Sequence, residues 1–276
     1  MFSYKAPGSL AIDLKGSKDE LEFLNISKDD ALAWPRVVHR TYPSTVNARM
    51  ENTIKPFVHK SVEINNTFLS IMENRLGLPK GALLDRHDWE KPSGSEARCI
   101  HKPAKKRDAV SDEANANATT KVASEPAEPE DPTVALGAHT DFGSLSFLHN
   151  RLGGLQVLPP GSTSWQYVRP LPGHAICNVG DALSIFSGGI LRSNLHRVVP
   201  PPGQQAYYPR WSLVFFLRPS NEIELKALSD ESVIVKAAMD KFTEEDRQRY
   251  YPKSTASEWF ARRVKYSRAV NRTVSL

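Results

Sequence analysis

The stretch Ala135–Leu158, ALGAHTDFGSLSFLHNRLGGLQVL, decides the fold. Short runs of Val, Leu, Ile and aromatic residues alternate there with Gly and Asn, and similar texture continues to Pro219. Such runs, bounded by turn residues, are typical of β-strands. No helix-length segment separates the later runs, so the pattern argues against a parallel α/β sheet and predicts a closed or double-sheet antiparallel architecture. The expected strands are Ala97–His101, Gly137–His139, Leu145–His149, Leu155–Leu158, Gln166–Arg169, Ala175–Val179, Ser184–Phe186, His196–Val199 and Trp211–Leu217.

Helices are expected on both sides of this β region, the first after an N-terminal loop. The segment Ser27–Trp34 begins with a serine cap and two acidic residues, which favour a helix start. Apolar residues recur at largely helical spacing through Ser44–Leu76, with a kink or fresh start expected at Pro56 and a stop at Gly77. Two further helices are expected near the C-terminus: Ser229–Lys241 and Thr255–Arg272.

Length and composition are those of one large or two modest globular domains. The chain has 276 residues, of which 40% are hydrophobic and 24% charged, which excludes whole-chain disorder. The net charge of +5 is only a weak hint of an anionic partner. We expect one β core with helical flanks: residues 1–92 as a loop and helical region, 93–221 as the core, and 222–276 as a C-terminal helical region.

A low-complexity insertion is expected at residues 104–133, between two strands of the core. It contains no aromatic residue and no Leu, Ile or Met, and it ends in the acidic, proline-rich run Glu125–Pro132. Such a composition buries too little apolar surface to offset the entropy lost on ordering. We interpret the insertion as a mobile surface loop, in preference to a lid over a substrate.

Membrane and secretory signals are absent from the sequence. Apolar runs such as Leu213–Leu217 are far shorter than the roughly 18 residues of a membrane span. The N-terminus lacks the layout of a signal peptide, and the two cysteines, Cys99 and Cys177, lack metal-finger spacing. The sequence therefore predicts a soluble, cytoplasmic protein with reduced thiols that binds neither membranes nor nucleic acid.

One histidine has a carboxylate two residues away within the β region, in the order His139-Thr-Asp141. Residues two apart in a strand share a face, so both side chains can reach one metal ion. His149, His174 and His196 are candidates for a third ligand, and His196 is favoured because it leads into a distant strand. Two histidines and a carboxylate leave open positions on Fe(II), whereas zinc prefers a more closed site.

A second pair of residues on one strand face, Arg210 and Ser212, opens an apolar strand. Burying an arginine is costly unless a carboxylate pairs with it. A guanidinium beside a hydroxyl forms a natural clamp for the distal carboxylate of a small dicarboxylic acid. Taken alone, the pair is better explained by an exposed arginine bound to a surface acid.

These motifs together resemble the isopenicillin-N-synthase-like family of Fe(II)/2-oxoglutarate-dependent oxygenases. The segments that carry the resemblance, in the family's order, are Gly137–Gly143, Gly153–Val157, Trp165–Val168, Asn178–Asp181, Ser187–Gly189, Asn194–Val198, Tyr208–Ser212 and Thr255–Trp259. The resemblance extends from about Lys15 to the end of the chain. It implies a mainly β fold, with a double-stranded β-helix (jelly-roll) core and helices packed outside.

The resemblance also implies the roles of individual residues. His139, Asp141 and His196 would be the iron ligands and form the catalytic centre. Arg210 and Ser212 would anchor the co-substrate 2-oxoglutarate. The reaction would consume O2, release succinate and CO2, and hydroxylate, desaturate or rearrange a small specialised metabolite. A monomer is expected, with a partner subunit as the alternative.

Two departures from the family pattern leave alternatives open. Lys102 stands where the family usually has a tyrosine that contacts 2-oxoglutarate; a lysine can attract the carboxylate as a point charge, so we predict it as a further cofactor-binding residue. The aromatic-rich N-terminal segment of the family has no match. The alternative hypotheses are a truncated inactive chain, a non-catalytic partner subunit and a 2-oxoglutarate-independent oxidase.

Overall fold

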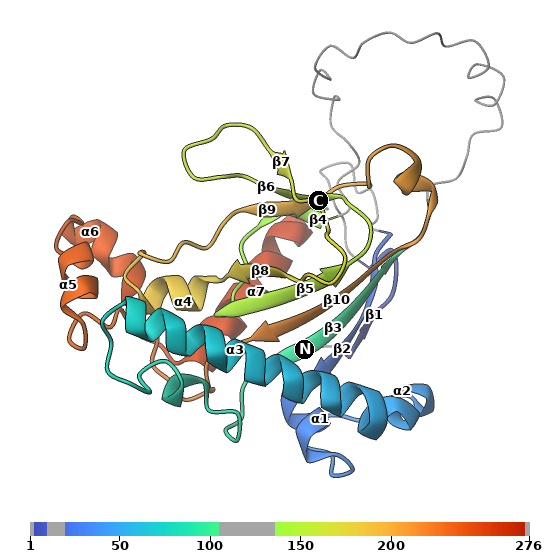
Figure 1. The fold of residues 1–276 in the computed structure, drawn as a ribbon, viewed down its shortest axis with the longest axis horizontal. Coiled ribbons are helices and arrows are strands. Elements are labelled where there is room, and N and C mark those ends of the chain that lie inside the picture. The colour runs from blue at the N-terminus through green and yellow to red at the C-terminus, as the bar shows by residue number, and fades with distance from the viewer. Residues whose placement is uncertain (1–2, 10–19, 105–135, 274–276) are drawn as a thin grey trace, which may run out of the picture.

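Two antiparallel sheets form the centre of the structure, a computed structural model that describes residues 3–9, 20–104 and 136–273 (Figure 1). The larger sheet has the order β1 (Tyr4–Lys5), β2 (Glu22–Ser27), β3 (Glu96–Lys102), β10 (Arg210–Leu217), β5 (Leu145–Asn150) and β8 (Ile176–Val179). The smaller sheet has the order β4 (Leu136–His139), β9 (His196–Val198), β6 (Leu155–Val157) and β7 (Gln166–Tyr167). This arrangement confirms the predicted mainly β, double-sheet architecture with flanking helices.

Strand β10 shows how the sequence alternation positions the site. It lies between β3 and β5, so both of its edges are paired. Alternate residues point to opposite faces of a sheet, and accordingly Ser212 and Val214 line the space between the sheets. Trp211 and Leu213 point outward, toward a hollow on the other face. Polar groups on the inner face of β10 are therefore directed into the molecule.

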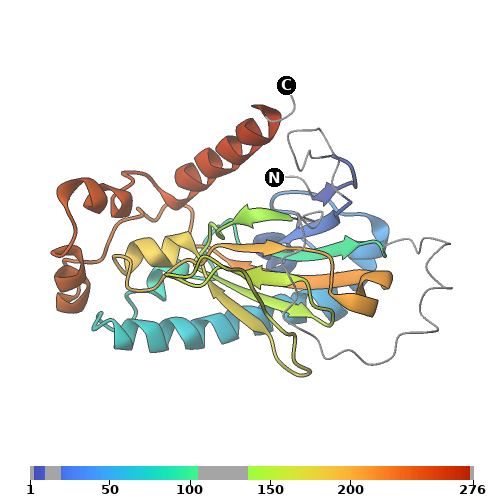
Figure 2. The same ribbon diagram turned by 90° about the horizontal axis from the view of Figure 1, so that it is seen from above.

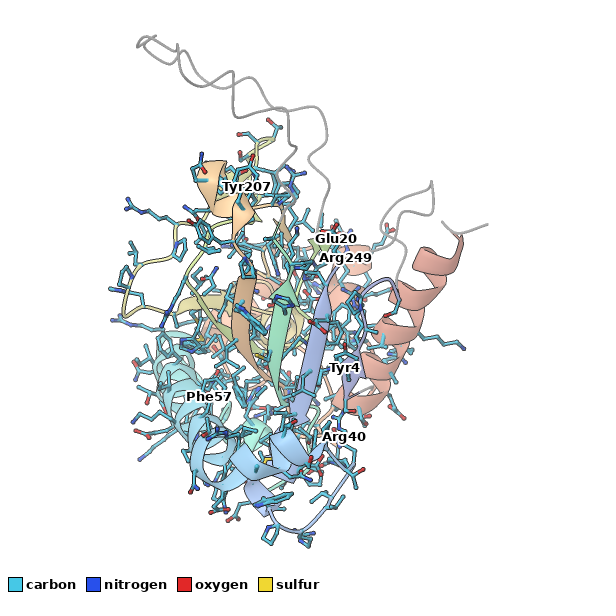
Figure 3. All side chains as sticks on the ribbon, turned by 90° about the vertical axis from the view of Figure 1, so that its right-hand side faces the viewer. Tyr4, Glu20, Arg40, Phe57, Tyr207 and Arg249 are labelled. Carbon is cyan, nitrogen blue, oxygen red and sulfur yellow. The ribbon has the colours of Figure 1, made fainter. Side chains whose placement is uncertain are left out.

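Helix α3 (Lys55–Arg75) covers part of the outer face of the larger sheet (Figure 2). Val58 and Leu69 are fully buried, and the Phe68 ring packs edge-on against Phe147 of β5, 5.3 Å between centroids. The predicted core-facing apolar stripe is thus confirmed. Figure 3 labels Phe57 on the same helix, whose ring lies 6.0 Å from that of His149 on β5.

The start and end of α3 follow from proline and glycine. Helix α2 (Ser44–Arg49) continues into a π-helical turn, Met50–Ile54, and α3 then begins with Pro56 in its first turn. The backbone is helical on both sides of Pro56, so the π-helical turn lies where the proline, which lacks an N–H group, interrupts the regular hydrogen-bond pattern. Gly77, with a φ of +64°, follows the last residues of α3. The expected stop is present, and the interruption expected at Pro56 takes the form of the π-helical turn before it and not of a fresh helix start.

The predicted strand Ser184–Phe186 is wrong, because these residues lie in helix α4 (Asp181–Phe186). The apolar run is short enough to fit either a strand or a buried helix. Tertiary contacts decide the choice: the backbone N–H groups of Asp181 and Ala182 donate to the carbonyls of Asp141 and Gly143. Strand β2 is a further difference, since only loop and helix are expected from the sequence of residues 1–92.

Further helices complete the flanks. The N-terminal helix α1 (Lys28–Ala33) begins as predicted, with the Ser27 hydroxyl accepting from the Asp29 N–H. The C-terminal helices are α5 (Val233–Met239), α6 (Glu244–Arg247) and α7 (Ala256–Thr273). Single 3-10 turns cover Asp85–His87, Gly203–Tyr207 and Gln248–Tyr250.

One buried hydrophobic cluster connects these parts, with members from α1, α3, the central strands and α7. The boundaries 1–92, 93–221 and 222–276 remain a prediction. Of the predicted insertion 104–133, all but residue 104 lies outside the described residues. Among the described helices, none is long and apolar enough to cross a membrane.

A buried histidine in the core makes the stability of the protein pH-dependent. His87 is 3% exposed; its Nδ1 donates to the Leu83 carbonyl at 2.6 Å, and its Nε2 accepts from the Ser144 hydroxyl at 2.6 Å. Burial lowers the pKa of His87 from 6.5 to about 4. The unfolded chain therefore binds this proton more readily, and the folded state loses stability as the pH falls from 6.5 toward 4.

We expect the wild-type free energy of unfolding to fall by about 2 kcal/mol more between pH 7 and pH 5 than that of a His87→Gln variant, given the shift to about 4. Urea unfolding at the two pH values measures this difference. The exposed His174 provides a control, because His174→Gln is expected to keep the wild-type pH dependence. Equal pH dependence in the wild type and in His87→Gln would contradict the assignment.

Candidate active site

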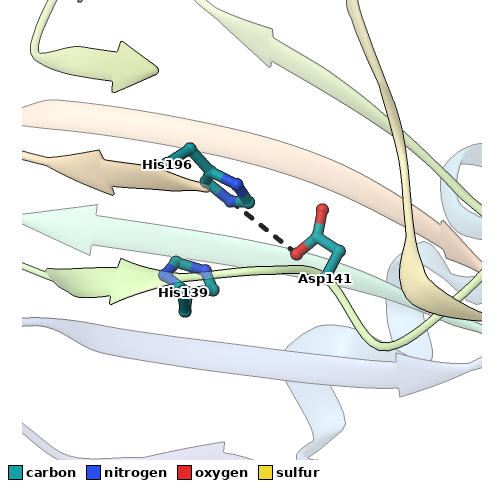
Figure 4. Close-up of side chains that lie close together, drawn as sticks. All are labelled: His139, Asp141 and His196. Carbon is teal, nitrogen blue, oxygen red and sulfur yellow. Dashed lines mark ion pairs between the residues drawn. The ribbon is translucent and has the colours of Figure 1, made fainter. Parts of the chain in front are cut away.

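The two strands β4 and β9 bring three candidate metal ligands together. His139 and His196 are direct partners in the antiparallel register, so both side chains project from the same face. Their ring centroids are 4.3 Å apart. Asp141 follows β4 by two residues, and its Oδ1 lies 3.8 Å from His196 Nε2 (Figure 4). One ligand atom from each of the three lies within 4.8 Å of the others.

Hydrogen bonds orient the carboxylate of Asp141. Its Oδ2 accepts from the Ser146 hydroxyl and from the Asn178 amide, each at 2.8 Å. Ser146 and Asn178 are partners in the β5–β8 register, so adjacent strands supply the two donors. Oδ1 is left directed toward His196. Such contacts around a ligand hold its orientation and raise metal affinity.

The two histidines present nitrogen lone pairs to the same point. Nδ1 of His139 donates to the Gly137 carbonyl at 2.8 Å, and Nδ1 of His196 donates to the Asn194 carbonyl at 3.1 Å. Nε2 of each ring is therefore the atom available for a metal. Burial, and then the neighbouring His196, lower the pKa of His139 and favour its neutral form, which is the form that ligates. Two imidazoles and one carboxylate fit Fe(II).

Arg210 provides a buried cation on the facing wall. Its Nε donates to the Gly153 carbonyl at 2.8 Å and its Nη1 to the Ser212 hydroxyl at 2.6 Å. Burial lowers the pKa of Arg210 to about 10, so the side chain stays charged at neutral pH. Nη2 is buried and has no hydrogen-bond partner in the described part of the chain. A buried N–H donor on a charged group is costly to leave without a partner. The Nη2 group of Arg210 is therefore suited to bind an anionic ligand such as a carboxylate.

The triad and Arg210 share one cavity of about 380 Å³ between the two sheets, a volume in the usual range for small-molecule sites. Ser212 also lines it, beside Arg210. The remaining walls are largely apolar, and include Leu148, Leu155, Val157, Ile176, Val198 and Val214. A small molecule with much apolar surface suits this lining.

The alternative third ligands lie elsewhere. His149 and His174 line a larger, open hollow on the outer face of the six-stranded sheet, together with Trp211. The structure thus brings His196, and neither of these two histidines, to the pair His139 and Asp141.

Lys102 is the predicted site residue that the structure places least centrally. It is the register partner of Arg210 in β3–β10. Its Nζ lies 3.3 Å from Oε2 of Glu20, a residue that precedes β2 and is labelled in Figure 3. Lys102 is not among the residues that line the cavity in the described part of the chain. A contact between Lys102 and 2-oxoglutarate therefore remains a prediction from the sequence.

Arg98, Arg218 and Phe260 line the cavity but are not predicted as site residues from the sequence. At the end of the cavity away from Arg210, the Arg218 guanidinium lies 4.4 Å from the Phe260 ring of α7 and 5.6 Å from the Phe216 ring. The Arg98 guanidinium lies 5.0 Å from the same Phe216 ring. Arginine faces stack on aromatic rings with an attraction of about 0.5–2 kcal/mol. No sequence signal identifies these contacts, because they join β3, the end of β10 and α7.

Part of the chain is similar to a known superfamily. Residues 116–219 match the model of the 2OG-Fe(II) oxygenase superfamily. A 2-oxoglutarate-dependent dioxygenase of Aspergillus fumigatus is 35% identical over 188 residues, which are 62% of this chain and 44% of the relative. Another from Gibberella zeae is 31% identical over 232 residues, 83% of this chain and 60% of the relative. The chain thus spans about half the length of these two relatives.

The fold is also found among solved structures. The crystal structure of a full-length Neurospora crassa protein in complex with alpha-KG superposes with a TM-score of 0.66 at 21% identity, covering 95% of this chain and 74% of that one. Residues 116–219 thus resemble a 2OG-Fe(II) oxygenase domain, and the fold is the predicted jelly-roll with flanking helices. Membership of the isopenicillin-N-synthase-like subfamily stays a prediction.

Replacing Asn178 tests how the orientation of Asp141 contributes to metal binding. We expect Asn178→Ala to weaken Fe(II) or Mn(II) binding roughly 10- to 100-fold, the usual effect of losing a contact to a metal ligand. Anaerobic titration of the metal-free protein measures the affinity. Asn150→Ala is the matched control. Asn150 lies in the same sheet as Asn178, but its side chain donates to the Leu152 carbonyl and not to Asp141. Equal affinities for the two variants would contradict this role.

Proposed function

We propose that this protein is an Fe(II)- and 2-oxoglutarate-dependent oxygenase that oxidises a small specialised metabolite with O2 and releases succinate and CO2. One observation carries the proposal: the His139, Asp141 and His196 ligand atoms share a cavity with a buried, incompletely bonded Arg210. The first group fits the metal and the second fits the co-substrate. The similarity to 2-oxoglutarate-dependent dioxygenases of Aspergillus and Gibberella supports the same chemistry.

The residues divide the work of such a reaction. His139, Asp141 and His196 would hold Fe(II), which supplies the open coordination positions for activation of O2. Arg210 and Ser212 bind the distal carboxylate of 2-oxoglutarate from the cavity wall. Ser146 and Asn178 keep Asp141 oriented through its Oδ2. The apolar walls exclude water from the reacting groups and select a substrate with apolar surface.

The alternative functions are less well supported. A non-catalytic chain would not need the two hydrogen bonds, from Ser146 and Asn178, that orient Asp141. A 2-oxoglutarate-independent oxidase would not need the free Nη2 donor of Arg210. The monomeric state, the location in the cytoplasm and the absence of nucleic-acid and membrane partners remain predictions from the sequence.

Turnover of 2-oxoglutarate tests the proposal directly. With Fe(II) and O2, we expect the wild-type protein to release succinate, at a slow uncoupled rate even without the physiological substrate. Asp141→Ala should lose this activity by more than about a hundredfold, because it removes the carboxylate ligand. Succinate is quantified against a metal-free sample. Absence of both iron-dependent succinate and an Fe(II)–2-oxoglutarate charge-transfer band in the wild type would exclude the proposed function.

Binding of 2-oxoglutarate tests the assignment of Arg210. We expect Arg210→Gln to raise the Kd for 2-oxoglutarate at least about thirtyfold, or roughly 2 kcal/mol, the lower limit for breaking a buried charged hydrogen bond. Isothermal titration of the Mn(II)-loaded protein measures this Kd. Metal affinity should be unchanged, which separates this effect from damage to the triad. In the same assay Lys102→Met shows whether the lysine contributes, and an effect as large as that of Arg210→Gln would transfer the anchoring role to Lys102.

A further inference from the structure

We infer that Arg263 of helix α7 is a positioning residue for the loop that carries Asp141. The inference rests on the proposed function, since it assigns a purpose to a contact with the candidate metal site. Arg263 is 122 residues away from Asp141 in the sequence, and it is neither a member of the triad nor one of the described residues that line the cavity. It acts through the residues on either side of Asp141.

The first contact is on the Thr140 side. Arg263 Nη2 donates to Asp181 Oδ2 at 2.9 Å and lies 3.4 Å from Thr140 Oγ1. The Thr140 hydroxyl donates to the same Asp181 oxygen at 3.1 Å. Three side chains, from the loop after β4, from α4 and from α7, thus form one polar cluster directly beside the candidate metal ligand.

The second contact is on the Phe142 side. The Arg263 guanidinium lies 4.7 Å from the Phe142 ring, and the Trp259 ring follows at 5.4 Å. Phe142 also packs edge-on against Trp259 and Phe260, at 6.3 and 6.1 Å between centroids. Arg263 therefore contacts the side chains on both sides of Asp141, Thr140 and Phe142, and Phe142 also packs against two aromatic rings of α7.

The loop backbone is attached to the same cluster. The Asp181 N–H donates to the Asp141 carbonyl at 2.8 Å, while the Asp181 side chain binds Arg263. Gly180 lies so close to the loop that an added Cβ would overlap the Gly143 carbonyl oxygen. With so little free space, a displacement of Asp181 also displaces the backbone of Asp141.

The exposure of Arg263 indicates what kind of effect to expect. Its side chain is 39% exposed. An ion pair with this much exposure to water contributes only about 0–1 kcal/mol to stability. The metal site depends instead on orientation, because a ligand displaced by a fraction of an ångström no longer matches the other two. Loss of Arg263 should therefore change metal binding much more than global stability.

The adjacent residue provides a matched control. Arg262 lies on the same helix, and its Nη2 donates to the Ser254 hydroxyl at 2.6 Å, away from the loop. The test compares full-length wild type, Arg262→Gln, Arg263→Gln and Arg263→Lys. Metal affinity is measured by anaerobic Fe(II) or Mn(II) titration, and global stability by urea unfolding.

We expect Arg263→Gln to weaken metal binding about tenfold, in the range for contacts outside the ligand shell, with unfolding close to that of Arg262→Gln. Arg262→Gln should retain wild-type affinity. Arg263→Lys should be intermediate, because it keeps the charge but loses the planar group that stacks on Phe142. Equal metal affinity in Arg262→Gln and Arg263→Gln would overturn the inference.

Amide hydrogen exchange gives a second readout that needs no metal. The Asp181 and Ala182 N–H groups donate to the Asp141 and Gly143 carbonyls, so their protection reports the attachment of the loop. Protection at these two amides should fall in Arg263→Gln alone, and unchanged protection would refute the positioning role. If the wild type bound no metal, the proposed function would fail, while the exchange measurement would still decide the role of Arg263.

Discussion

The antiparallel register of β4 and β9 is the constraint on which the site depends. His139 and His196 converge because they are direct partners in this short ladder. A shift of one residue would turn one imidazole to the opposite face of the sheet. The ladder contains an irregularity between Leu136 and His139: Leu136 pairs with Val198 and His139 with His196, so three steps along β4 match two along β9. The larger sheet then supplies what the smaller one lacks: two donors for Asp141 from β5 and β8, and the cation from β10.

The end of the cavity away from Arg210 is lined by charged and aromatic side chains together. Glu96 is 2% exposed and accepts from Arg98 at 2.8 Å and from Arg218 at 3.3 Å. Burial acts to raise the pKa of Glu96, but the charges of Arg218 and Arg98 outweigh it, and the pKa lies below its ordinary value. The carboxylate thus remains ionised, and the arginines are held against Phe216 and Phe260. Arg98 and Arg218 thus form part of the cavity wall, and their charges also compensate the buried carboxylate of Glu96.

Local patterns in the sequence predicted what is local in the structure. The i, i+2 spacing placed Arg210 near Ser212 on β10, and the alternation of runs predicted most strands. Asp141 lies beyond the end of β4, so its orientation depends on its hydrogen bonds to Ser146 and Asn178 and not on the strand spacing. The helix α4 was mistaken for a strand, because the identity of such a short apolar run depends on its contact with the 141–143 loop. Strand β2 has no regular alternation of buried and exposed residues; it forms by pairing with β3, some seventy residues away. The contacts of Arg263 and Arg218 also join distant elements, so no spacing rule reveals them.

The close approach of Gly180 to Gly143 has a consequence for how this chain can diverge. An added Cβ at Gly180 would overlap a carbonyl oxygen, and one at Gly143 would lie 2.5 Å from the Leu217 carbonyl oxygen. Any other residue at either position requires the backbone beside Asp141 to move. The aliphatic side chains of the cavity wall, such as Val157 and Ile176, have no such restriction. A larger side chain at one of these positions can be balanced by a smaller one at another. A library of variants should therefore accept new cavity shapes readily while rejecting nearly every change at these two glycines.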